Sequence, residues 1–324
     1  MSETLPQVSI ALTTYNGAPH LAAQLDSLLA QQGVDFEIVV ADDGSSDDTL
    51  QILARYAARD ARLRLLPTEG NLGFNGNFAR CFAACRAELI SPSDQDDVWA
   101  PQKTAGLVAA LGDAEAVYSN SRFVDASGQP LHKCMSDEVR MLHGHDPRAY
   151  LFGNSVSGHA MLFRRGLLAA ALPFPKGVYF DWWLAFVAAG RGGVRYLDEV
   201  LVDYRRHPKA VTCQPQTDDR ASRRRAAIEL LAVRLAAMAA HAGPQQAFVR
   251  ALEASWWGWY RSLVGWGMFR FLLRHAGVLF EVSPMRRSAL SRARRYLIGY
   301  RLKNGLLPRR YPAITTPPPT QKAA

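Results

Sequence analysis

The sequence is poor in cysteine. Its 324 residues include four cysteines, and no two of them form a Cys-x-x-Cys pair. Disulfide-held secreted scaffolds and thiolate zinc sites use more cysteines at closer spacing. We therefore expect reduced thiols with structural roles at all four positions, namely Cys81, Cys85, Cys134 and Cys213.

An uninterrupted apolar run long enough to cross a membrane is also missing. The longest candidate, Trp256 to Phe280, contains Arg261, Arg270 and Arg274, and arginine is costly to place in hydrocarbon. A helix lying in the membrane interface is therefore favoured over one that spans it. Residues 1–7 are polar and show no basic stretch leading into an apolar run, so nothing indicates a secretory signal and we expect a cytoplasmic protein.

Acidic residues are nearly missing from the last third of the chain. Residues 220–324 carry 19 Lys and Arg against 3 Asp and Glu, whereas residues 1–219 carry 19 against 26. The net charge of +9 therefore combines a body of −7 with a tail of +16. Such a tail is typical of a segment that meets a polyanion, either nucleic acid or an anionic membrane surface.

Strand and helix patterns alternate through the first part of the chain. An apolar content of 48% over this length is enough for one sizeable domain plus a smaller unit. Apolar runs predict strands at Val8–Leu12, Phe36–Ala41, Arg64–Pro67, Glu88–Ser91 and Ala116–Ser119. Helical periodicity predicts helices at His20–Gln31, Thr49–Ala58 and Phe78–Arg86. This alternation indicates an α/β fold with a doubly wound, mostly parallel sheet.

The pattern changes to arginine-rich helices after residue 219. We expect them over Ala221–His241, Phe248–Phe280 and Met285–Lys303. The Pro-rich end is typical of disorder. The predicted units are a nucleotide-binding domain at 1–215, a basic helical extension at 216–310 and a disordered tail at 311–324.

Polar residues collect where the predicted parallel strands end, and ligands bind at that edge of such sheets. Asp94 and Asp96 form an Asp-x-Asp pair directly after a buried strand. Two carboxylates so close repel each other unless a cation lies between them, and Mg²⁺ or Mn²⁺ suits oxygen ligands of this kind. A diphosphate supplies the remaining oxygens. The alternative is a solvated acidic turn or a helix cap.

The ends of the first two strands offer groups for a nucleotide base. Asp42 or Asp43 could accept the ring N–H of uracil or thymine, and Thr13, Thr14 and Tyr15 present hydroxyls and an aromatic face on which a pyrimidine stacks. The alternatives are an N-cap cluster without a ligand and a tyrosine that belongs to the core.

Seven segments follow one another in an order and spacing typical of a known family. They are VSIALTTYNGAPHLAAQLDSLLAQ, EIVVADDGSSDDT, NLGFNGNF, SDQDDVWAPQK, SGHAMLFRR, YFDWWLAFVAAG and YRRHPKAVT. Together they cover about the first 210 residues. The chain resembles the family 2 inverting glycosyltransferases, which have a GT-A fold, and in particular their rhamnosyltransferase-like branch.

The resemblance implies roles for individual positions. Asp94 and Asp96 match the Asp-x-Asp motif, which contacts the donor diphosphate and a divalent metal, with Asp96 as the direct ligand. His207 lies where some relatives place a further metal or diphosphate contact; a structural histidine is the alternative. The positions implied in nucleotide binding are Thr14, Tyr15, Asp42, Asp43, Asn71 and Asn77.

Asp181 matches the acidic residue that serves as the catalytic base of the family. It lies between Phe180 and Trp182, where partial burial would raise its pKa toward that of a useful base; the alternative is a surface or cap aspartate. Such a base takes the proton of the acceptor hydroxyl while a metal stabilises the departing diphosphate, and the anomeric carbon is inverted.

The resemblance also implies the partners. We expect a UDP- or dTDP-sugar as donor, a cell-surface glycan or lipid-linked acceptor, and peripheral association of the basic extension with the inner face of the cytoplasmic membrane; an oligomer is also compatible with the sequence. Two departures from the family pattern concern the acceptor side and the geometry of His207, namely Asn120, where Asp is common, and Pro208.

Two other readings of the sequence remain open. The basic extension contains Trp256, Trp257, Trp259 and Trp266, which could stack on bases in a nucleic-acid-binding protein. Against this, the acidic body would repel phosphates. An inactive membrane-docking scaffold is the third hypothesis, which the joint presence of the four carboxylates disfavours.

Overall fold

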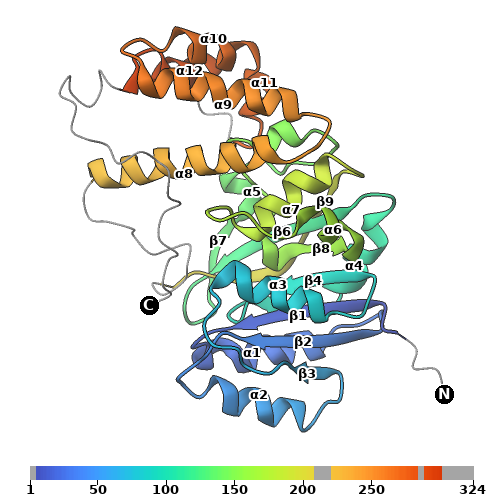
Figure 1. Ribbon diagram of the computed structural model, residues 1–324. Helices are drawn as coiled ribbons and strands as arrows, with labels where there is room; N and C mark the ends of the chain where they lie inside the picture. Colours follow the sequence, from blue (N-terminus) through green and yellow to red (C-terminus); the bar gives the residue numbers. More distant parts are fainter. Residues whose placement is uncertain (1–4, 208–219, 284–287, 301–324) are drawn as a thin grey trace.

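A computed structural model describes residues 5–207, 220–283 and 288–300 (Figure 1). Its centre is a nine-stranded sheet in the order β3-β2-β1-β4-β8-β6-β9-β5, with β7 paired to β6. The strands are β1 (Val8–Thr14), β2 (Phe36–Asp42), β3 (Leu63–Leu65), β4 (Leu89–Ser93), β5 (Val98–Trp99), β6 (Ala116–Val124), β7 (Pro130–Cys134), β8 (Met161–Arg164) and β9 (Val194–Arg205).

The sheet is parallel through β3-β2-β1-β4 and between β6 and β9, whereas β8 runs antiparallel between β4 and β6. The helices of this part are α1 (Ala18–Leu29), α2 (Thr49–Ala57), α3 (Phe74–Ala84), α4 (Lys103–Leu111), α5 (Met135–Glu138), α6 (Leu168–Ala171) and α7 (Phe180–Ala189). The predicted α/β class is confirmed.

Alternate residues of the central strands face two hydrophobic cores, as the two-residue period of a strand requires. Ile10 and Val40 belong to the core with α1, α2 and α4, whereas Ala11 and Val39 belong to the core with α3 and α7. Helices therefore cover both faces (Figure 1). Because each fully buried Val or Ile side chain contributes about 1.5–3 kcal/mol, the two cores hold the strand ends in place.

Two predicted elements were displaced. Helix α3 begins at Phe74, four residues before the predicted Phe78, because Gly73 with a φ of 74° makes the turn into the helix. Strand β3 is short and ends at Leu65 rather than Pro67.

A helical extension follows β9 and packs on the α7 side of the sheet (Figure 1). Its helices are α8 (Arg220–Ala240), α9 (Gln246–Arg261), α10 (Trp266–Arg274), α11 (Ala276–Leu279) and α12 (Ala289–Ala293). Leu235, Trp256 and Leu272 join Phe180 and Trp183 in one continuous core. None of the helices described combines the length and apolarity needed to cross a bilayer.

The prediction of one basic helix over Met285–Lys303 is wrong for residues 288–300, the part of this range that the structure describes. Only α12 and a short 3-10 turn at Arg294–Tyr296 occur there, and the chain bends back. Gly265 permits the fold-back, because a Cβ at this position would collide with the carbonyl oxygen of Tyr296. The tail at 311–324 lies outside the described residues, and the proposed unit boundaries stay predictions.

Cys81, Cys85 and Cys134 are free thiols, as predicted, and Cys213 lies outside the described residues. Burial raises the pKa of Cys85 to about 12 and raises that of Cys81 well above its usual value. These two thiols are therefore neutral groups of the core.

Candidate functional site

The parallel strands bring the predicted polar residues to one edge of the sheet. In the register of β1 with its neighbours, Thr14 lies opposite Asp42 and Leu12 lies opposite Ser93. The chain leaves β4 at Ser93 and enters the Asp-x-Asp segment directly. The ends of β1, β2 and β4 therefore meet at one place, as the sequence predicted.

Asp42 organises its own turn. Its carboxylate accepts hydrogen bonds from the Thr14 hydroxyl at 2.7 Å, from the backbone N–H of Gly44 and from both N–H and hydroxyl of Ser45. Thr13 and Thr14 are buried within β1. These contacts account for the polarity of Asp42 and Thr14 without a ligand.

Asp43 connects this turn to the glycine-rich segment before α3. Its two carboxylate oxygens accept the backbone N–H groups of Leu72 at 2.6 Å and Gly73 at 3.0 Å. Burial raises its pKa, and the two N–H donors oppose that rise. Asn71, one residue earlier, is exposed beside the same turn.

Asn77 has a structural contact in the core. Its side chain is buried and donates to the carbonyl of Ala41 at 2.8 Å while it accepts from Arg80 at 3.0 Å. It thus holds α3 against the end of β2. The structure places it next to Asp43 in the fold, with its polar atoms already paired.

Gln95, the middle residue of the Asp-x-Asp motif, ties that motif to the first strand. Its side-chain oxygen accepts the N–H of Tyr15 at 2.8 Å, and its amide nitrogen donates to the carbonyl of Tyr15 at 3.0 Å. Sequence reasoning overlooked this residue. It fixes the half-buried Tyr15 beside the two carboxylates.

Asp96 contacts His207, although 111 positions separate them. His207 Nε2 lies 2.8 Å from Asp96 Oδ2, and both side chains are partly exposed, at 15% and 18%. Arg205 holds the end of β9 against the Asp-x-Asp segment and so brings His207 to Asp96. The Arg205 side-chain Nε donates to the carbonyl of Asp96 at 2.8 Å, and the Arg205 backbone N–H donates to the carboxylate of Asp97. The structure thus brings His207 to Asp96, and the ligand roles of both residues stay predictions.

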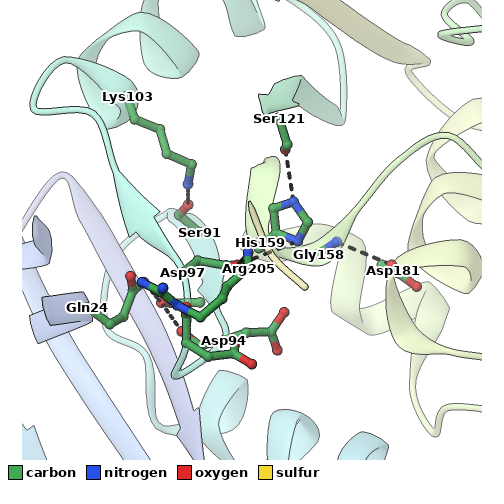
Figure 2. Close-up of polar contacts among 12 residues, drawn as sticks. Gln24, Ser91, Asp94, Asp97, Lys103, Ser121, Gly158, His159, Asp181 and Arg205 are labelled. Carbon is green, nitrogen blue, oxygen red and sulfur yellow. Dashed lines mark hydrogen bonds and ion pairs between the residues drawn. The ribbon is translucent and has the colours of Figure 1, made fainter. Parts of the chain in front are cut away.

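A second, buried acid–histidine pair lies beneath the motif (Figure 2). Asp97 Oδ2 lies 3.7 Å from His159 Nδ1, and His159 Nε2 contacts the Ser121 hydroxyl at 2.9 Å. Burial lowers the pKa of His159 to about 3, and burial raises that of Asp97 well above its usual value. His159 is therefore neutral near pH 7.

Asp94, Asp97 and His159 place one ligand atom each within 4.8 Å of one another. Sequence reasoning missed Asp97 and His159. The available signals were a third aspartate directly after the Asp-x-Asp pair and a histidine inside the SGHAMLFRR segment.

Asp181 lies in the first turn of α7, where the positive end of the helix favours a carboxylate. It accepts the N–H of Trp182 at 2.6 Å and that of Gly158 at 3.2 Å (Figure 2). Asn75 of α3 accepts the N–H of Phe180 at 3.0 Å and so fixes the start of α7.

The electrostatics connect Asp181 to the Asp-x-Asp motif. Burial raises the pKa of Asp181 to about 6 despite its two N–H donors. Burial together with the charges of Asp96 and Asp181 raises the pKa of Asp94 to about 8. The candidate base and the candidate metal carboxylates therefore share one region. With a pKa near 6, Asp181 is largely ionised at pH 7 and able to take a proton.

Comparisons with known proteins agree with this geometry. The family model described as glycosyl transferase family 2 matches residues 9–170. An uncharacterized glycosyltransferase of Nostoc sp. is 28% identical over 214 residues, 62% of this chain and 65% of the relative. The succinoglycan biosynthesis protein ExoO of Rhizobium meliloti is 30% identical over 142 residues, 43% of this chain and 40% of that protein. The matches thus span less than two thirds of these relatives' own length.

Two solved structures share the fold. The crystal structure of S. aureus TarS 1–349 in complex with UDP-GlcNAc has a TM-score of 0.58 at 17% identity and covers 90% of this chain and 88% of that chain. The mannosyltransferase PcManGT from Pyrobaculum calidifontis, in complex with GDP-Man and Mn²⁺, has a TM-score of 0.53 at 19% identity, with 85% and 76% covered. Since the family model matches half of the chain, the protein belongs to glycosyl transferase family 2.

Proposed function

We propose that this enzyme transfers a hexose, rhamnose or another, from a UDP- or dTDP-sugar to a hydroxyl of a cell-surface glycan or lipid-linked acceptor, with inversion at the anomeric carbon. The observation that carries the proposal is the convergence of four residues from three separate segments on one region, namely Asp94 and Asp96, Asp181, and His207. The structural neighbours bind UDP-GlcNAc and GDP-Man with Mn²⁺, which supports a nucleotide-sugar donor.

The residues present fit a divalent metal. Asp96 and His207 offer an oxygen and a nitrogen 2.8 Å apart, a donor set that suits Mn²⁺, and Asp94 adds a further carboxylate. When bound, the metal supplies stabilisation of the negative charge that develops on the leaving diphosphate. Asp97 and His159 are 0% and 4% exposed, so we assign them to support of the motif rather than to a metal that must also reach substrate.

Asp181 acts as the general base in this proposal. Its carboxylate takes the proton of the acceptor hydroxyl as that oxygen bonds to the anomeric carbon and the bond to the diphosphate breaks on the opposite side. The N–H groups of Gly158 and Trp182 hold the carboxylate in one orientation throughout.

Tyr15 and Asp43 bind the nucleoside. Both oxygens of Asp43 already accept one N–H each, but a carboxylate accepts about four hydrogen bonds, which leaves room for the ring N–H of a pyrimidine. Asn71 lies exposed on the adjacent segment, where it can reach the ribose or base.

The donor assignment is tested by thermal unfolding of the full chain with UDP, dTDP and GDP sugars, each with and without Mn²⁺. A ligand at about 100 times its Kd adds roughly 2.7 kcal/mol to the free energy of unfolding, so we expect a clear rise in Tm with a uridine or thymidine donor and Mn²⁺ together. Stabilisation by none of these sugars would contradict the proposal.

The helical extension is proposed to dock on the inner face of the cytoplasmic membrane. Leu263, Val264, Trp266 and Ile298 are large apolar side chains with exposed fractions of 46–59%. Val264 and Ile298 are bridge partners, so these side chains form one apolar edge. The exposed Arg261 and Arg270 flank it, and the region is strongly basic. Apolar groups inserted between headgroups and arginines that contact anionic lipids suit such a surface.

We expect Val264→Ser with Trp266→Ser to lower the fraction of protein that co-sediments with phosphatidylglycerol vesicles by about tenfold or more, because each buried apolar side chain contributes roughly 1.5–3 kcal/mol. Val200→Ser is the matched control, since Val200 is a 43% exposed apolar residue of β9. An unchanged bound fraction would remove the docking proposal, and salt-sensitive binding to DNA without vesicle binding would favour nucleic acid instead.

A further inference from the structure

Arg234 of α8 places its guanidinium against the residue that follows the candidate base. Its Cζ lies 3.5 Å above the ring of Trp182. The indole itself is fixed, because Trp182 Nε1 donates to the carbonyl of Tyr150 at 2.6 Å. A cation from the helical extension, beyond the residues that the family model matches, thus lies beside the active-site helix α7.

The charge of Arg234 has no counter-charge within the described part of the chain. No carboxylate there forms an ion pair with it, and its Nε is buried without a hydrogen-bond partner. Burial lowers its pKa to about 10, and the nearby phenol of Tyr179, which is uncharged near pH 7, opposes this shift. The guanidinium is partly buried, and its stacking on Trp182 supplies no negative charge, so a ligand that supplies an anion would be favoured here.

Tyr179, two residues before Asp181, links Arg234 electrostatically to the candidate base. Tyr179 lies near both groups, since Asp181 raises its pKa and Arg234 lowers it. Arg234 lies against Trp182 of α7, whereas the Asp-x-Asp segment follows the end of β4.

We propose that Arg234 and Trp182 form an acceptor subsite that binds an oxyanion, a phosphate or carboxylate group carried by the acceptor next to its reacting hydroxyl. This assignment rests on the proposed function, because it takes Asp181 as the base that faces the acceptor. Arg234 donates two parallel hydrogen bonds to such a group, a geometry that the planar guanidinium provides and an ammonium does not. The fixed indole keeps the guanidinium in one plane before the acceptor arrives.

The test uses the full chain with its seven tryptophans replaced by 5-fluorotryptophan. Trp182→Phe assigns the fluorine resonance of Trp182. Glycerol 3-phosphate and glucuronate are titrated as phosphate and carboxylate probes, and glycerol as the neutral probe. UDP with Mn²⁺ is titrated into the same samples, so that failure of the donor site is seen separately from failure of this subsite.

We expect the Trp182 resonance to shift saturably with at least one anion and not with glycerol. Arg234→Met should weaken that response by about tenfold or more while Tm changes little, because the positive charge is removed and the apolar stem that packs against the protein is kept. Arg234→Lys, which keeps the charge, should weaken it less. Arg223→Gln, at an exposed position of the same helix, should match the wild type.

Three results would overturn the subsite. They are an anion response in Arg234→Met equal to that of the wild type, a parallel loss of UDP–Mn²⁺ affinity in that variant, and a response to glycerol as strong as to the anions. If Arg234→Met does not fold, Arg234→Lys decides, and an unchanged anion affinity in that variant counts against paired hydrogen bonds from the guanidinium.

Discussion

Asp181→Asn is expected to reduce sugar transfer by about 10²-fold or more, as for loss of a general base, while nucleotide-sugar binding stays nearly unchanged. The asparagine amide has about the size of the aspartate carboxylate. Its oxygen can still accept the backbone N–H of Gly158, the first residue of the 3-10 turn Gly158–Ala160. It cannot take up a proton from the acceptor hydroxyl. Release of UDP or dTDP from the donor measures the rate, and calorimetric titration of the donor measures binding.

The pH profile separates a base from a merely structural aspartate. Because burial raises the pKa of Asp181 to about 6, kcat/KM of the wild type should rise as the pH increases through about 6, where the carboxyl loses its proton. Asp181→Asn should lack this rise. Asp113→Asn, at an exposed position after α4, is the matched control and should keep wild-type rate and profile. Full turnover of Asp181→Asn would show that the base lies elsewhere.

Asp96→Ala is expected to weaken Mn²⁺-dependent binding of UDP by about tenfold or more, in addition to lowering the rate. The variant removes the carboxylate oxygen that lies 2.8 Å from His207 Nε2, and so leaves His207 as the one remaining ligand of that pair. Titration of UDP with and without Mn²⁺ measures the effect, and binding without metal should be the same in both proteins.

His207→Ala tests the other half of that pair. Like Asp96→Ala, it should weaken the Mn²⁺-dependent binding of UDP, because His207 contributes the nitrogen ligand. Asp198→Asn, at an exposed position of β9, leaves the pair intact and serves as the control. Equal UDP affinity with Mn²⁺ in Asp96→Ala and wild type would refute the ligand role of Asp96.

The parallel half of the sheet could be predicted from the sequence because its information is local. The apolar runs that become β1, β2 and β4 each end in polar residues, and parallel strands joined by helices bring those ends to one edge. The Asp-x-Asp pair, Asp43 and Tyr15 were therefore found as neighbours from strand order alone. The hydrogen-bond partners of the site residues could not be predicted. Asp42 pairs with groups of its own turn, and Asn77 donates to the backbone of β2.

The second half of the site depends on contacts between residues far apart in the chain. Strand β9 pairs with β6, and Arg205 at its end reaches back to the Asp-x-Asp segment, which places His207 beside Asp96. No local pattern encodes that approach. His159 could be found only in three dimensions, because a histidine in an apolar segment has many structural roles and its neighbour Asp97 is 62 positions away.

Composition and short-range pattern thus determined the α/β class, the acidic strand ends, the basic helical extension and the family resemblance, because each of these depends on residues close together in sequence. Tertiary packing alone decided which acids become neutral, which histidine meets Asp96, and that Arg234 of the extension lies over Trp182. The physical reason is that the burial of a group and its distance from other charges depend on which parts of the chain pack together. The pKa of a side chain, and whether a charge finds a partner, are therefore set by the folded environment and not by the residue type alone.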